Sequence, residues 1–147
     1  MLAIISSMRG YRFSPSLLGA SASIAFGAVS GTALFNLIAW LTAGSGISFA
    51  EAYSAVPHNR FYLPLSLVCA LISGLLSGLV AAKLSRHRPY LNALVSSVLV
   101  LVWSIVLIAS PLREITFDTL TLVDAFVLPA PSAVLGAYIF LRWGNDG

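Results

Sequence analysis

The chain has 147 residues, of which 59% are hydrophobic and only 9% are charged, and its net charge is +3. Soluble domains carry about 25% charged residues, so this composition excludes an ordinary water-soluble protein and favours one solvated by lipid. The few basic residues are scattered rather than clustered on one face, which argues against a nucleic-acid partner. We expect a single membrane domain over residues 1–147, without a cofactor or metal centre.

The first predicted span covers about residues 15–43. It is longer than the ~30 Å hydrocarbon core requires, so we expect it to tilt or to protrude from the membrane. Its small residues recur at a spacing of four and include Gly27 and Gly31. This spacing predicts a face that a second helix can approach closely. Asn36, in the outer half of the span, is a candidate for a hydrogen bond between helices.

The loop after the first span contains Ser48 and Glu51 at the spacing of a capping box. We therefore predict a short helix that lies at the membrane surface and stops before Pro57.

The second predicted span, about residues 63–83, is uncharged until Lys83. Gly74 and Gly78 continue its spacing of four, which favours a close right-handed helix crossing. A three-four spacing of small residues is present as well, so the left-handed crossing stays open. We expect this glycine face to pack against the first span.

Two further spans are predicted, over about residues 90–110 and 120–143. The fourth is interrupted by Pro129 and Pro131, and we expect the helix to kink or break there because each proline removes a helical hydrogen bond. The predicted fold is therefore all-α: a polytopic membrane protein with four transmembrane helices and a short interfacial helix in the first outer loop.

Lysine and arginine are distributed unequally between the two predicted membrane faces. Two of them, Arg60 and Arg113, fall on one side, and six fall on the other: Arg9, Arg12, Lys83, Arg86, Arg88 and Arg142. Because the more basic side of a membrane protein faces the cytoplasm, we expect both termini to be cytoplasmic.

Asp124 is the one acid inside a predicted span. A carboxylate in hydrocarbon is costly, so it is a candidate for a proton relay, an ion site or a partner contact. The break at Pro129 and Pro131 lies within two turns of it, and transport sites are built at broken helices. A structural role is also open, because Thr121 and Asp124 have capping spacing near a helix start.

An enzyme is not expected. His58 and His87 both fall in loops on opposite faces of the membrane, so no histidine inside a span can activate a serine such as Ser77.

The run Ile72–Asn92, ISGLLSGLVAAKLSRHRPYLN, resembles a loose group of uncharacterised bacterial four-span inner-membrane proteins. These have a glycine-rich second helix that ends in Ala-Ala and basic residues, and a fourth helix with proline and glycine, here Pro129, Pro131 and Gly136. The resemblance implies a four-span fold in the inner membrane, and it implies no activity.

Two functional hypotheses follow. The first is a non-enzymatic structural, accessory or assembly component that packs, as a homo-oligomer or within a larger membrane complex, through its small-residue helix faces. The alternative is a small oligomeric transporter or channel that uses Asp124 and the break at Pro129 and Pro131.

Overall fold

The computed structural model describes residues 13–85, 87–108 and 127–143. All regular structure in these residues is helical: α2 (Ser14–Ala43), α3 (Phe49–Ala55), the 3₁₀ turn η1 (Val56–His58), α4 (Tyr62–Leu84), α5 (Pro89–Ile108) and α7 (Pro129–Trp143). Three of these helices, α2, α4 and α5, are long and apolar enough to cross a membrane. The all-helical class and the membrane-compatible length of the first three predicted segments are confirmed.

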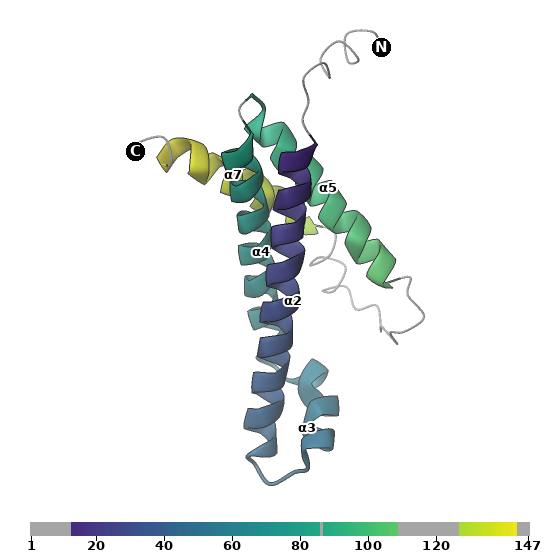
Figure 1. Ribbon diagram of the computed structural model, residues 1–147. Coiled ribbons are helices and arrows are strands. Elements are labelled where there is room, and N and C mark those ends of the chain that lie inside the picture. Colours follow the sequence, from purple (N-terminus) through teal and green to yellow (C-terminus); the bar gives the residue numbers. More distant parts are fainter. Residues whose placement is uncertain (1–12, 86, 109–126, 144–147) are drawn as a thin grey trace.

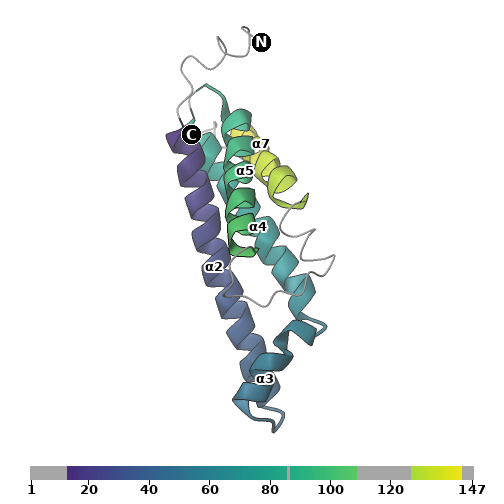
Figure 2. The same cartoon turned by 90° about the vertical axis from the view of Figure 1, so that its right-hand side faces the viewer.

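Helix α4 is the centre of the arrangement, since it contacts α2, α5 and α7. Helices α2 and α4 form a long hairpin, and α5 and α7 pack on one half of it (Figures 1 and 2). Helix α3 lies at the other end of the hairpin, against α2. The first described turn of α2 and the last turn of α7 lie at the same end of the molecule (Figure 1).

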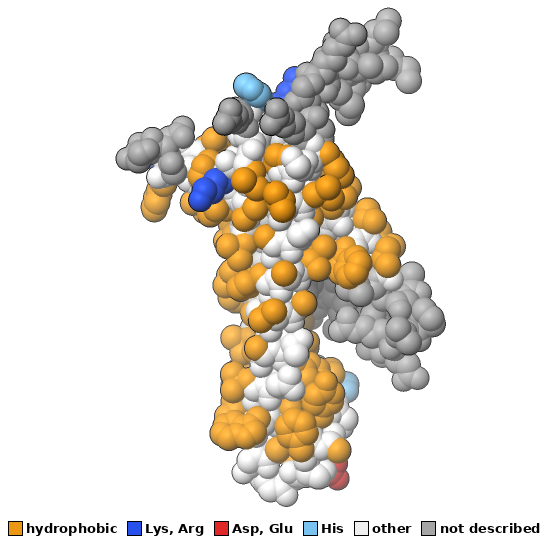
Figure 3. Space-filling view, viewed as in Figure 1, with side chains coloured by type: hydrophobic (Ala, Val, Ile, Leu, Met, Phe, Trp, Pro, Cys, Tyr) orange, Lys and Arg blue, Asp and Glu red, His pale blue; other side chains and the backbone are white. Residues whose placement is uncertain are grey.

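The interior of the bundle is built from small side chains, and the large apolar ones point outward. The buried residues of α4 are all Ser, Gly or Ala, and so are those of α7. By contrast, Val29 is 71% exposed and Trp40 is 68% exposed. Apolar side chains cover much of the face seen in Figure 3. Such a surface would aggregate in water, so its natural solvent is lipid.

The loop helix α3 begins at the predicted capping box. The Ser48 hydroxyl accepts a hydrogen bond from the backbone N–H of Glu51, and the Glu51 carboxylate accepts one from the backbone N–H of Ser48. As predicted, the α-helix ends before Pro57, although the chain continues through Pro57 as η1. The sharp turn that leads into α3 uses Gly46, whose φ of 98° lies in a region that suits glycine.

A second, more conventional apolar cluster joins α3 and η1 to the end of α2. Ile38, Ala39 and Val56 are buried there, and partly buried Phe35 packs beside them. The Phe35 ring lies 4.6 Å from the ring of Tyr53 and 5.7 Å from that of Tyr62, centroid to centroid. Because Tyr62 opens α4 at the level of Phe35, the last two turns of α2 extend beyond the start of α4.

Candidate functional site

Paired serines join α4 to its neighbours on one side. The Ser23 and Ser73 hydroxyl oxygens lie 2.8 Å apart, and the Ser73 hydroxyl also donates to the backbone carbonyl of Ser23. One turn further along α4, the Ser77 hydroxyl is hydrogen-bonded to that of Ser96 on α5. All four residues are buried. Burying a hydroxyl is costly unless it is hydrogen-bonded, so these pairs fix which faces of α2, α4 and α5 meet.

Asn92 extends this polar ladder to the end of the bundle. Its Oδ1 accepts a hydrogen bond from the Ser16 hydroxyl of α2 at 2.8 Å. Its Nδ2 donates to the Ser85 hydroxyl at 2.6 Å and to the Arg88 carbonyl at 3.1 Å. The amide therefore ties α2 and α5 to the turn after α4. In the described part of the chain, no buried side-chain nitrogen or oxygen lacks a hydrogen-bond partner.

The glycines of α4 face α7 rather than α2. A Cβ built at Gly74 would lie 2.8 Å from the Ser132 Cβ, and one at Gly78 would lie 2.8 Å from the Ala133 Cα. From the opposite side, a Cβ at Gly136 would overlap the backbone of Leu75. These are backbone-to-backbone contacts, for which only glycine leaves room.

Helix α2 does pack against α4, as predicted, but through other residues of α4. A Cβ at Gly19 would lie 2.6 Å from the Ser77 carbonyl oxygen, and one at Gly27 would lie 3.5 Å from the Ser73 hydroxyl. A Cβ at Gly31 would meet no described atom within 4 Å. The contact with α2 therefore uses Ser73 and Ser77, whereas Gly74 and Gly78, one position along, form the separate face for α7.

Pro129 and Pro131 lie in the first turn of α7. The backbone bends at Leu128 and α7 begins at Pro129, so the helix does break where the prolines predict. Ser132 closes this start, because its backbone N–H and its hydroxyl both donate to the Leu128 carbonyl. Prolines supply no N–H, so Ala130 contributes the one backbone donor among the first three residues.

The structure separates the other two candidate residues. Asn36 is exposed on α2, and its side-chain Nδ2 donates to the Thr32 carbonyl of its own helix at 2.9 Å. It makes no hydrogen bond to another helix in the described residues, contrary to the expectation for this residue. Asp124 lies outside the described residues.

The described side chains at the helix junctions are thus hydroxyls, one amide and small apolar groups. The serine ladder could have been suspected from sequence, since Ser73 and Ser77 lie one turn apart on a glycine-rich helix; their partners Ser23 and Ser96 could not. Comparison of the chain with protein-family models, with curated proteins and with solved structures found no match.

Proposed function

We propose that the chain is a multi-pass inner-membrane protein with four spans and both termini in the cytoplasm. Helices α2, α4 and α5 supply three spans. Helix α7 has 15 residues, about 22 Å, so a fourth span also needs residues that precede Pro129. Helix α3, with the end of α2, then lies at the outer membrane surface, where the exposed rings of Phe49 and Tyr53 suit the headgroup region.

Within this membrane we propose a non-enzymatic accessory or assembly role. The observation that carries it is a second small-residue face, on the outside of α2 and opposite buried Ser23. The residues of this face are small, exposed and recur at helical spacing: Ser21, Ala25, Ala28 and Thr32. Because the faces of Gly74 and Gly78 are occupied within the chain, this outer α2 face is the one that supports docking of a second copy or of a larger membrane partner.

The transporter alternative draws support from the position of α7. Ser132, in the first turn of α7, lies against Gly74, which is near the middle of α4. A helix that starts at mid-span is the geometry from which transport sites are built. The prolines, however, remove backbone donors from this start, which fits a break made for packing. Asp124 would have to provide the ionisable group.

The test of the accessory role is the mass of the protein purified from its own membrane in mild detergent. We expect the protein to co-purify with further copies or with a larger partner, and Ala28→Leu to dissociate that complex. Ala33→Leu is the matched control: it makes the same change at an exposed residue that lies roughly 140° away around the same helix. A monomeric protein, or a complex that Ala28→Leu leaves intact, contradicts the proposal.

Flux measurements on reconstituted protein distinguish the alternative. Flux that Asp124→Asn abolishes, in a homo-oligomer with unchanged mass, favours a transporter over an accessory subunit. Unaltered flux removes Asp124 from consideration.

A further inference from the structure

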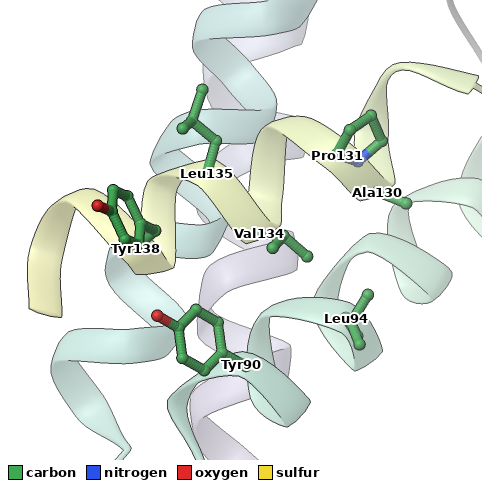
Figure 4. Close-up of a pocket in the computed structure, with 7 residues that line it drawn as sticks. All are labelled: Tyr90, Leu94, Ala130, Pro131, Val134, Leu135 and Tyr138. Atoms are coloured by element: carbon green, nitrogen blue, oxygen red, sulfur yellow. The ribbon is translucent and has the colours of Figure 1, made fainter.

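An apolar groove lies between α5 and α7, on the side of α7 away from the glycine contact with α4. Figure 4 shows the residues that line it, and its volume is about 550 Å³. This volume falls within the range of roughly 300–1,000 Å³ that is common for ligand clefts. Five of the lining residues are aliphatic or proline: Leu94, Ala130, Pro131, Val134 and Leu135.

The polar groups of the groove are gathered at one end. Tyr90 and Tyr138 face each other across that end, and their hydroxyl groups point the same way, whereas Pro131 and Leu94 lie at the other end (Figure 4). Beyond Tyr138, the Arg142 guanidinium donates a hydrogen bond from Nη1 to the Tyr138 hydroxyl at 2.7 Å. Arg142 is partly exposed and has further N–H donors in its planar fork, a geometry suited to a phosphate.

The charge at this end of the molecule is uniformly positive among the described residues. Helix α5 begins here, after the turn that contains Arg88, and α4 ends here at Lys83 and Leu84. Glu51, the one described carboxylate side chain, lies at the opposite end (Figure 3). In Figure 3 the visible basic atoms lie at the end where α7 finishes. A ligand with an anionic head and an apolar tail therefore matches both the charge and the surface.

We propose that this groove binds one anionic glycerophospholipid of the cytoplasmic leaflet. An acyl chain lies along the aliphatic side chains, and the phosphate of the headgroup accepts hydrogen bonds from Arg142 and the Tyr138 hydroxyl. The tyrosines then stand at the level of the glycerol and headgroup, where such amphipathic rings concentrate. This site is independent of the accessory role and of the outer face of α2.

Lipid titration of the delipidated full-length protein, followed by native mass spectrometry, tests the proposal. The two probes are phosphatidylglycerol and phosphatidylcholine with the same acyl chains. We expect one phosphatidylglycerol to bind at least fivefold more tightly than phosphatidylcholine. A basic side chain near an anionic headgroup contributes ~1 kcal/mol, so Arg142→Gln should weaken phosphatidylglycerol binding about fivefold and leave phosphatidylcholine unchanged.

Two further variants separate the groove from general charge attraction. Val134→Trp fills the groove and should weaken both lipids; Leu94→Trp does so from α5 if the first variant does not fold. Arg60→Gln is the matched control, because Arg60 lies at the opposite end of the hairpin over the Phe61 ring. Equal affinity for both lipids overturns the proposal, as does an equal effect of Arg60→Gln and Arg142→Gln. Displacement of phosphatidylglycerol by excess inorganic phosphate, with no effect of either tryptophan, would show a soluble-anion site instead.

Discussion

The contact between α4 and α7 at Gly78 gives a quantitative prediction for Gly78→Ala. The added Cβ would lie 2.8 Å from the Ala133 Cα and closer still to the Ala133 carbonyl oxygen. Carbon atoms in contact are normally about 3.5–4.0 Å apart, so α7 must move away by about 1 Å. Overpacking of this kind costs about 1–3 kcal/mol, and the upper end applies because backbone atoms cannot rotate aside.

Part of this cost is offset by helix propensity, since alanine is favoured over glycine in a helix by about 1 kcal/mol. The expected net result is a loss of about 2 kcal/mol in the free energy of unfolding. Gly31→Ala is the matched control, because its Cβ meets no described atom within 4 Å and only the propensity gain remains. The two variants should therefore differ by about 3 kcal/mol.

Reversible unfolding in mixed micelles, titrated with a denaturing detergent and followed by circular dichroism, measures both variants. If Gly78→Ala and Gly31→Ala agree within about 1 kcal/mol, α7 does not pack on Gly78 as described, and the account of the α4 face is refuted.

Two further predictions concern hydrogen bonds. Ser16→Ala removes the donor to Asn92 Oδ1 and should lower the free energy of unfolding by about 1 kcal/mol, whereas Ser66→Ala, whose hydroxyl bonds within its own helix, should change it less; equal losses would contradict an interhelical role. The Ser48 hydroxyl and, secondarily, its backbone N–H lower the pKa of Glu51, so the capping box stabilises α3 at neutral pH, and that stabilisation is lost as the pH falls through the lowered pKa. Hydrogen exchange of the α3 amides should therefore accelerate in acid, and Glu51→Gln should remove this dependence; exchange that follows only its intrinsic pH dependence would count against it.

Local features of the fold could be predicted from the sequence because their causes are local. Helices α2, α4 and α5 begin and end within a few residues of the predicted spans, since long uncharged runs with proline at their starts leave few alternatives. The capping box of Ser48 and Glu51 was predictable for the same reason, because three residues of chain contain both partners.

The partners of the helix faces could not be predicted in the same way. A spacing of four shows that Gly74 and Gly78 form a smooth face, but it does not show which helix occupies that face. The prediction assigned it to the first span, whereas α7 occupies it and α2 packs on Ser73 and Ser77. Adjacent stripes about 100° apart on one helix admit two neighbours, and the choice between them depends on distant hydroxyl partners such as Ser96.

The small-residue interior also determines how stability should vary with temperature. The heat-capacity change of unfolding arises mainly from apolar surface that becomes exposed to water. Here Gly78, Ala133 and their neighbours carry little apolar surface, and lipid rather than water would cover it after the helices separate. Separation of α7 from α4 in a bilayer should therefore have a heat-capacity change near zero. The stability of this contact would then fall almost linearly on warming, without the maximum that water-soluble domains show near room temperature.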